Sequence, residues 1–241
     1  MRFVGILKRL VGLALLAAVT LAGWKLAREQ PQDLPWTSLD LRRPAGLFTG
    51  RKIVRLRDKP ARCRALLAPA GIEDRAAPPV NGPGVCGYAD GERLEKAGAR
   101  TIAYHPGVTV SCPVDAALLL WERDVLQPAA MRLFGSRVVR IDDYGSYNCR
   151  RINGREGGPW SEHATADAID IAGFRLADGM RISVAANWSG KDRKAVFLHQ
   201  ARNGACPLFA TVLSPDYNAL HHDHLHLDQA ERGAFGWRAC R

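Results

Sequence analysis

No two cysteines in this 241-residue chain form a Cys-x-x-Cys pair, although the chain has six of them. The missing pair argues against a thiolate metal site and against a thioredoxin-like redox motif. An even number of cysteines spread along a chain is typical of disulfides in an oxidising compartment, so we expect three bridges, with fifteen pairings open. The six are Cys63, Cys86, Cys112, Cys149, Cys206 and Cys240.

The larger part of the chain lacks an excess of basic residues. Residues 61–241 hold 22 Lys and Arg against 20 Asp and Glu, whereas residues 1–60 hold 12 against 4. A nucleic-acid-binding domain carries its basic surface on the fold, so this balance argues against nucleic acid as a partner. The amino-terminal excess favours an anionic neighbour, such as phospholipid headgroups or an acidic cell-wall polymer.

Charge is also missing from Val11 to Trp24. This run is shorter than the roughly twenty residues that span a bilayer, but it suffices when counted from Phe3, with Lys8 and Arg9 reaching the headgroups. Residues 1–27 therefore predict an uncleaved signal anchor in the inner membrane, with a cleaved signal peptide and a buried core helix as alternatives. The basic residues before the run place the domain outside the cytoplasm, in the periplasm.

The rest of the chain divides into a linker and one domain. Four prolines and a basic cluster at 51–57 predict a linker over residues 28–60. Residues 61–241 are globular in composition and long enough for one core. A helix-rich segment followed by mixed strands predicts an α+β fold, a single domain with a mostly antiparallel sheet.

The longest expected helix runs from Ala116 to Phe134, after a start at Ser111 and Pro113, with a kink at Pro128 and an end at Gly135. We also expect strands over 137–141, 182–186 and 208–213, a hairpin turn over 174–179, and a helix over 191–203 that Gly204 ends.

Histidine is scarce, with seven in the chain, and five of them fall in two segments, 161–171 and 221–228. The second segment alternates polar and apolar residues with the two-residue period of a half-buried strand. On one strand, His222, His224, His226 and Asp228 would share a face. Imidazoles and a carboxylate on one face suit Zn²⁺.

The first segment also alternates, from Ala168 to Ile171, so Asp170 projects opposite its apolar neighbours. His163 precedes Asp170 by seven residues, which would put the two on opposite faces of a straight strand. A turn must intervene, and the small residues of 164–166 can form it. A single histidine would be read as a surface residue, but the two segments together predict the halves of one zinc site.

These motifs resemble a known superfamily. Ser-x-His, an Asp seven residues after that His, and a downstream His-x-His are similar to the zinc D-Ala-D-Ala carboxypeptidases, a group that includes murein endopeptidases and the Hedgehog amino-terminal domain. Within it, the chain most resembles the bacterial extensin-like C-terminal domain family. The resemblance covers roughly residues 60–241 and is carried by Ser146–Arg150, Ser161–His163, Ala168–Ile171 and His222–Asp228.

The resemblance implies a role for each motif residue. His163, Asp170 and His226 correspond to zinc ligands, and His224 to a residue that moves protons beside the metal. Further active-site roles are implied for His221 and for Arg150, which would contact a peptide carboxylate or the developing oxyanion. The family often has a Glu base before the last ligand, and this chain has none at that spacing, so Asp223 is the alternative base. A Gly that is usual three residues after the first ligand is replaced by Ala166.

The expected function, on this resemblance, is a zinc-dependent peptidase that cleaves stem-peptide or cross-link amide bonds of peptidoglycan. The fold would be that of the Hedgehog domain and the D-Ala-D-Ala peptidases. A non-catalytic cell-wall-binding module that retains a zinc site is the alternative. A structural zinc or calcium domain is a third class, although calcium prefers oxygen ligands to imidazole.

Overall fold

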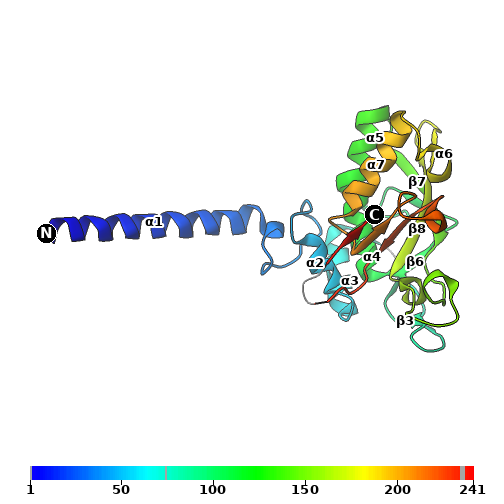
Figure 1. The fold of residues 1–241 in the computed structure, drawn as a ribbon, viewed down its shortest axis with the longest axis horizontal. Helices are drawn as coiled ribbons and strands as arrows, with labels where there is room; N and C mark the ends of the chain where they lie inside the picture. Colours follow the sequence, from blue (N-terminus) through cyan, green and yellow to red (C-terminus); the bar gives the residue numbers. More distant parts are fainter. Residues whose placement is uncertain (1, 74, 234–236) are drawn as a thin grey trace.

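A long helix and a folded domain make up the computed structural model, which describes residues 2–73, 75–233 and 237–241. Helix α1, Arg2–Glu29, carries the amino terminus away from the domain (Figure 1). An 18-residue apolar window within its stretch Phe3–Glu29 has a mean hydropathy of 2.0 and is 0% buried, which rules out a buried core helix. The length and composition suit a membrane crossing, either as an anchor or as a signal sequence.

Within the described residues, a seven-stranded sheet has the order β12-β10-β11-β8-β7-β5, with β9 paired to β8. Its pairs are antiparallel except β5 with β7 and β10 with β12, which are parallel. The strands are β5 (Ala103–His105), β7 (Val138–Gly145), β8 (Ala168–Leu176), β9 (Arg181–Ser183), β10 (Thr211–Leu213), β11 (Leu225–Asp228) and β12 (Ala239–Cys240). The expected combination of helices with a mostly antiparallel sheet is confirmed.

Helices pack on this sheet through contacts between aromatic side chains. Phe174 of β8 lies 5.9 Å, between ring centroids, from Trp121 and 5.2 Å from Phe197. Trp121 ends helix α4 (Cys112–Trp121), and Phe197 lies on α7 (Arg193–Ala205). Rings at these distances bury a large apolar area, so they fix β8 against the helical layer.

A π turn, Glu122–Leu126, interrupts the helix expected over 116–134. The chain continues without a break as α5 (Gln127–Phe134), and Pro128 lies in its first turn, directly after the π turn. Proline has no N–H to donate to the preceding helical turn, so the hydrogen-bond pattern is interrupted there. The expected interruption is therefore a π turn before the proline. Gly135 ends α5 in the left-handed conformation, as expected, with φ of 65°.

Two helix boundaries differ from expectation. The strand expected over 182–186 ends at Ser183, where α6 (Val184–Asn187) begins. Helix α7 runs past Gly204 to Ala205. Gly204 packs against Val125 of the adjoining π turn, where a methyl group on residue 204 would overlap the valine side chain. Its small size serves helix packing and does not end the helix.

Shorter elements complete the domain. The small strands form two further sheets, β1-β4-β6 and β2-β3. They are β1 (Arg75–Ala76), β2 (Val80–Asn81), β3 (Gly87–Tyr88), β4 (Gly91–Arg93) and β6 (Thr109–Ser111). The short helices are η1 (Pro31–Asp33), α2 (Thr49–Val54), α3 (Pro60–Leu67), η2 (Ala68–Ala70), η4 (Ile152–Gly154), η5 (Glu162–Thr165) and η6 (Ala219–His221).

The segment expected as a linker, residues 28–60, packs onto the domain instead of running free. Leu41 and Ile53 are 1% and 0% exposed and belong to the main hydrophobic core. Lys52 is also buried, with its ammonium bonded to the Pro31 carbonyl at 2.9 Å. The prolines here bound short helices and turns, so the folded unit begins near residue 31.

All six cysteines lie in the described residues, and they form the three expected disulfides. The pairs are Cys63–Cys112, Cys86–Cys149 and Cys206–Cys240. The first joins α3 to α4, and the last ties the carboxyl-terminal strand to the end of α7. The second holds the segment that precedes Arg150.

Candidate metal centre

Asp170 and His226 face each other because two strands pair in one register. Strands β8 and β11 are antiparallel neighbours, and Asp170 is the Cα partner of His226. The residues that flank them, Ile169, Ile171 and Leu227, are 0% exposed and point to the core. The alternation therefore places a carboxylate and an imidazole on the same face of the sheet, as the sequence predicts.

His163 reaches the same place through the predicted turn. It lies in η5, a short 3₁₀ helix whose N-cap Ser161 accepts a hydrogen bond from the His163 backbone N–H. Ala166 then turns the chain into β8 with φ of 57°, a left-handed conformation that glycine adopts more readily.

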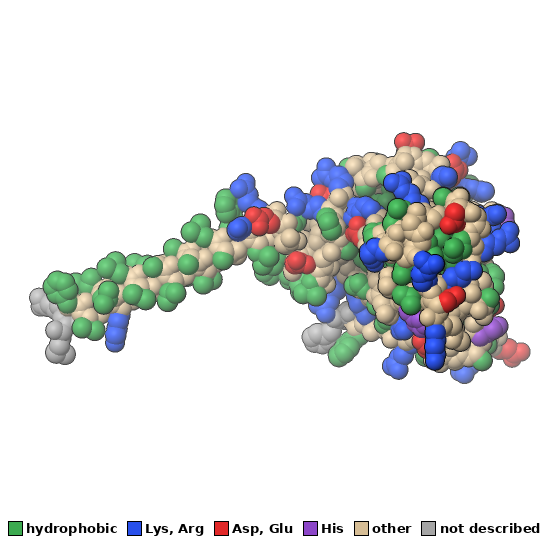
Figure 2. Space-filling view, turned by 90° about the horizontal axis from the view of Figure 1, so that it is seen from above, with side chains coloured by type: hydrophobic (Ala, Val, Ile, Leu, Met, Phe, Trp, Pro, Cys, Tyr) green, Lys and Arg blue, Asp and Glu red, His purple; other side chains and the backbone are tan. Residues whose placement is uncertain are grey.

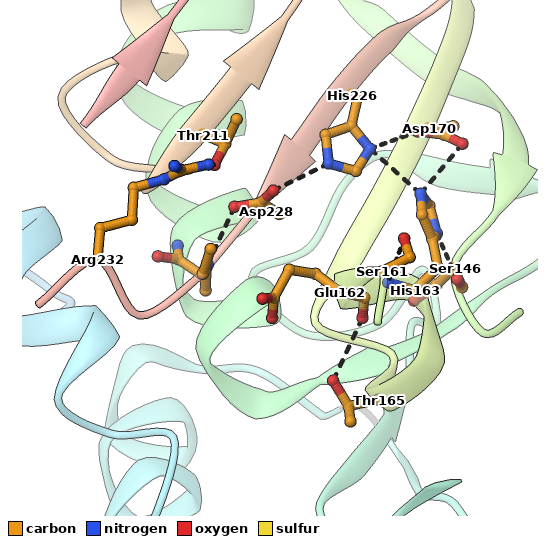
Figure 3. A network of polar contacts seen from close by, with 12 residues as sticks. Ser146, Ser161, Glu162, His163, Thr165, Asp170, Thr211, His226, Asp228 and Arg232 are labelled. Carbon is orange, nitrogen blue, oxygen red and sulfur yellow. Dashed lines mark hydrogen bonds and ion pairs between the residues drawn. The ribbon is translucent and has the colours of Figure 1, made fainter. Parts of the chain in front are cut away.

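Three donor atoms converge between these elements (Figure 3). His163 Nε2 is 3.1 Å from His226 Nδ1 and 3.2 Å from Asp170 Oδ2, and His226 Nδ1 is 2.9 Å from Asp170 Oδ1. Atoms that share a tetrahedral zinc at about 2.0–2.1 Å lie about 3.3 Å apart. The two imidazole nitrogens are therefore close to the separation of two ligands on one ion, and each oxygen of the Asp170 carboxylate is close to that separation from one of them.

Each imidazole is held from its outer side. His163 Nδ1 lies 2.6 Å from the Ser146 carbonyl oxygen, so Nδ1–H donates and Nε2 is left with its lone pair. The Nε2–H of His226 donates to Asp228 at 3.0 Å, which leaves Nδ1 facing Asp170. Outer partners of this kind fix the tautomer and orientation of metal-binding histidines. The inner nitrogens are thus the available donors.

Electrostatics favour a cation at this point. Burial opposes the ionisation of Asp170, yet His163 and His226 donate hydrogen bonds to its carboxylate when their inner nitrogens carry protons, and so hold the pKa of Asp170 well below the ordinary value. Burial likewise lowers the pKa of His226, but the carboxylates of Asp170 and Asp228 outweigh it and raise the value to about 9. A metal ion can take the place of the proton that these carboxylates attract to His226.

The donor set fits zinc. In the described parts of the chain, His163, Asp170 and His226 form the group whose donor atoms all lie within 4.8 Å of one another. Two imidazole nitrogens and one carboxylate oxygen are ligands that Zn²⁺ prefers, and three protein ligands leave one coordination position open. Calcium takes six or more oxygen ligands, so this set does not suit it.

His163, Asp170 and His226 are called the triad below, and His224 lies beside this group without belonging to it. Its Nε2 is 3.6 Å from Asp170 Oδ1, and its Nδ1 is 2.9 Å from Asp223 Oδ1. The Tyr144 hydroxyl bonds the same Asp223 carboxylate and helps hold the pKa of Asp223 below its ordinary value, after the contribution of His224. Asp223 thereby orients His224 with Nε2 toward the triad.

Arg150 and His221 lie on the wall of a cleft of about 560 Å³ that opens onto the triad. The His221 ring centroid is 5.2 Å from that of His224, and its Nδ1–H donates to Asn218 at 2.7 Å. Burial, followed by the nearby imidazoles, lowers the pKa of His221 to about 4, so the ring is neutral at pH 7.

The structure does not bring His222 to the site. Strand β11 begins at Leu225, so His222 lies in the preceding turn and not on the strand face expected for it. Its side chain is 72% exposed. The other three residues of that expected face, His224, His226 and Asp228, do lie at the triad.

Two contributors were not apparent from the sequence. The Ser146 carbonyl is a backbone group, which no side-chain pattern reveals. Arg57 lies in the supposed linker, yet its guanidinium is 3.0 Å from Glu162 and 2.8 Å from Asp167. It therefore clamps both ends of the turn that carries His163. Only the basic cluster at 51–57 hinted at such a contact.

Comparison with known proteins places the larger part of the chain in one family. Residues 61–241 match the family model described as extensin-like protein C-terminus. No curated protein and no solved structure matches the chain.

Proposed function

This chain belongs to the extensin-like protein C-terminus family over residues 61–241, and from that premise we propose that it is a zinc-dependent peptidoglycan peptidase. It would cleave amide bonds of the stem peptide or cross-link, outside the cytoplasmic membrane, with α1 as a signal anchor in the inner membrane. The resemblance to the zinc D-Ala-D-Ala carboxypeptidases, and with it a Hedgehog-like fold, is part of this proposal.

One observation carries it: three inner donors face each other at 2.9–3.2 Å, and each imidazole is oriented by an outer partner. His163, Asp170 and His226 would hold the ion. When bound, zinc supplies a Lewis acid and lowers the pKa of water to about 7. The open side of the triad faces a cleft, as a catalytic site requires.

The chain's own residues then have separate tasks. Asp223 holds the Nδ1–H of His224, so Nε2 can accept a proton from the attacking water and return it to the leaving amine. The cleft wall carries Arg150, Arg232 and Arg241. Guanidinium groups bind carboxylates in a bidentate manner, so the cleft favours a peptide that bears carboxylates. This is the chemistry of a peptidoglycan stem.

A non-catalytic wall-binding module is the second candidate. The same cleft and zinc would then bind the polymer without hydrolysis. The dyad of Asp223 and His224 favours the peptidase, because a binding module has no use for an imidazole oriented toward the metal by a carboxylate.

The deciding experiment incubates the zinc-loaded protein with purified sacculi and analyses the released fragments, with and without a chelator. His224→Ala should keep its zinc and lose about 10²–10⁴-fold of the turnover, the scale of a general base. His222→Ala is the matched control, since that ring is exposed and should change neither zinc content nor turnover. Intact sacculi with the zinc-loaded wild type would favour the binding module.

A further inference from the structure

The junction between α1 and the domain is short and held by hydrogen bonds. The Gln30 N–H still bonds the helix at Leu26, and the next residue, Pro31, accepts from the Lys52 ammonium at 2.9 Å. Two further bonds, Phe48 N–H to Gln32 and Leu47 N–H to Asp33, tie the same few residues to α2. The end of α1 therefore lies beside α2 (Figure 1).

A basic pocket of about 430 Å³ opens between α2 and the carboxyl-terminal segment. Among the described residues that line it, six are basic and two, Asp58 and Glu231, are acidic. The basic ones are Arg51, Arg55, Arg57, Lys59, Arg232 and Arg238. Figure 2 shows Lys and Arg side chains, with a few acidic ones, where the α1 stalk meets the domain, and further basic side chains over the rest of its surface.

Most of this charge is not neutralised within the protein. Arg57 is engaged by Glu162 and Asp167. Over the part of the chain that the structure describes, Arg51, Arg55 and Lys59 have no carboxylate within 4.0 Å, and all three are exposed. Such a group of cations attracts an anionic ligand.

Arg238 forms one wall of the pocket. Its guanidinium lies against Gly50 of α2, where a methyl group would overlap it, and it donates to the Phe209 carbonyl at 2.6 Å. Burial and the charge of Arg51 lower the pKa of Arg238 to about 10, the direction expected of a cation without an anionic partner. Contacts within the protein therefore hold Arg238 in the pocket wall without a bound ligand.

Large apolar side chains stand exposed in the pocket lining and in the segment that joins η1 to α2. Trp237, beside Arg238, is 75% exposed, and Leu47, which precedes α2 by two residues, is 77% exposed. Trp36, between η1 and α2, is 76% exposed. Tryptophan is enriched at the membrane–water interface, where its ring sits at headgroup level.

We propose that this pocket binds the phosphate headgroups of anionic lipids in the membrane that α1 crosses, and so docks the domain on the bilayer. The short junction holds α2 within reach of the headgroups, and basic residues beside a span attract anionic lipid. Trp36, Leu47 and Trp237 enter the interface around the cations. An acidic wall polymer has the same charge, but the junction brings the lipid surface to the pocket first. The inference rests on the proposed role of α1 as a membrane anchor and does not depend on peptidase activity.

The test reconstitutes the full chain into vesicles of phosphatidylcholine alone or with phosphatidylglycerol. Each vesicle also contains a lipid with a headgroup nitroxide, which quenches nearby tryptophan. The signal of Trp237 is the difference between the wild type and Trp237→Phe. We expect quenching in the anionic vesicles, less in the neutral ones, and a loss of this difference at about 1 M salt, where the Debye length is about 3 Å.

The triple variant Arg51→Gln, Arg55→Gln, Lys59→Gln changes only exposed side chains and should abolish the difference. Each cation near an anionic surface shifts such an equilibrium by roughly fivefold. The control variant Arg137→Gln, Arg181→Gln, Lys191→Gln removes three exposed cations near β9 and α6, away from α1, and should keep it. Equal quenching of Trp237 in the anionic and the neutral vesicles overturns the proposal, and so does a triple variant that behaves like the wild type. A change in the Trp237 signal that follows added sacculi and not phosphatidylglycerol also overturns it.

Discussion

At the residue scale, the triad depends on groups that have already fixed which nitrogen of each imidazole is free. Ser146 holds His163, and Asp228 holds His226. Since the inner nitrogens and Asp170 are the only donors assigned to the ion, loss of any one leaves a two-ligand remnant, which binds weakly.

We expect the protein to bind roughly one zinc per chain, and His163→Ala, Asp170→Ala and His226→Ala each to lose most of it, because a structural or catalytic site needs at least three protein ligands. Metal analysis of the purified variants measures this. His222→Ala serves as the control and should retain full occupancy. Full occupancy in all three ligand variants would exclude this ligand set.

Asp228→Asn tests the outer partner separately. The amide keeps the shape of the side chain but removes the charge that stabilises the Nε2–H of His226. We expect a zinc affinity lower by about 10–100-fold, the usual cost of losing such a partner. Competition with a chromogenic chelator gives the constant, and an unchanged constant would show that Asp228 only fills space.

The backbone conformation of Ala166 allows a prediction about the free energy of unfolding. Its left-handed backbone costs about 1–2 kcal/mol in a non-glycine residue. Ala166→Gly relieves that cost but loses a buried methyl group, about 0.8 kcal/mol, and makes the unfolded chain freer by about 0.5–1 kcal/mol. The free energy of unfolding should therefore stay nearly unchanged, whereas Ala166→Val should lower it strongly, since a β-branched residue resists this conformation. Denaturant unfolding of both variants measures the difference.

At the element scale, disulfides decide how firmly the cleft wall is held. Cys86–Cys149 anchors the segment that precedes Arg150, whereas Cys63–Cys112 joins α3 to α4 away from the cleft. The two bridges close loops with sequence separations of 63 and 49, so their removal separates a local effect on the cleft from a general loss of stability.

Cys86→Ser with Cys149→Ser should lower the free energy of unfolding by about 2–5 kcal/mol and raise KM for peptidoglycan fragments, because Arg150 loses its support. Cys63→Ser with Cys112→Ser should cost a similar free energy while KM stays unchanged, because neither cysteine nor its neighbours in the chain line the cleft. Kinetics on soluble peptidoglycan fragments gives KM, and thermal unfolding of the same two double variants gives the change in stability. If the two variants raise KM equally, the cleft wall does not depend on the nearer bridge.

At the scale of the whole molecule, the folded unit and the family segment do not coincide. The family match begins at residue 61, but Leu41 and Ile53 belong to the core. The apolar window of α1, by contrast, is 0% buried against the domain. The first thirty residues and the next thirty therefore contribute very differently to stability.

A chain that begins at residue 31 should unfold at nearly the same temperature as the full chain, since α1 buries nothing on the domain. A chain that begins at residue 61 should unfold at a clearly lower temperature, because four core side chains, Leu39, Leu41, Ile53 and Leu56, are lost, at roughly 2–5 kcal/mol each. Circular dichroism of the two purified truncations makes the comparison. Equal midpoints for both would mean that residues 31–60 are a linker after all.

The sequence by itself determined whatever depends on local period and composition. Alternation around Asp170 and His226 is a property of a strand, and it put each side chain on the correct face. The apolar helix at the amino terminus and the even set of cysteines also follow from local composition.

Only the tertiary structure decided what depends on contacts between distant segments. The register of β8 with β11 aligns Asp170 and His226, and it is set by packing and not by either strand alone. The same holds for the Ser146 carbonyl behind His163, the cysteine pairs, and the packing of residues 31–60. Their prolines are equally compatible with a free linker and with short packed helices. What distinguished the two was the burial of Leu41 and Ile53 against helices that lie far along the chain.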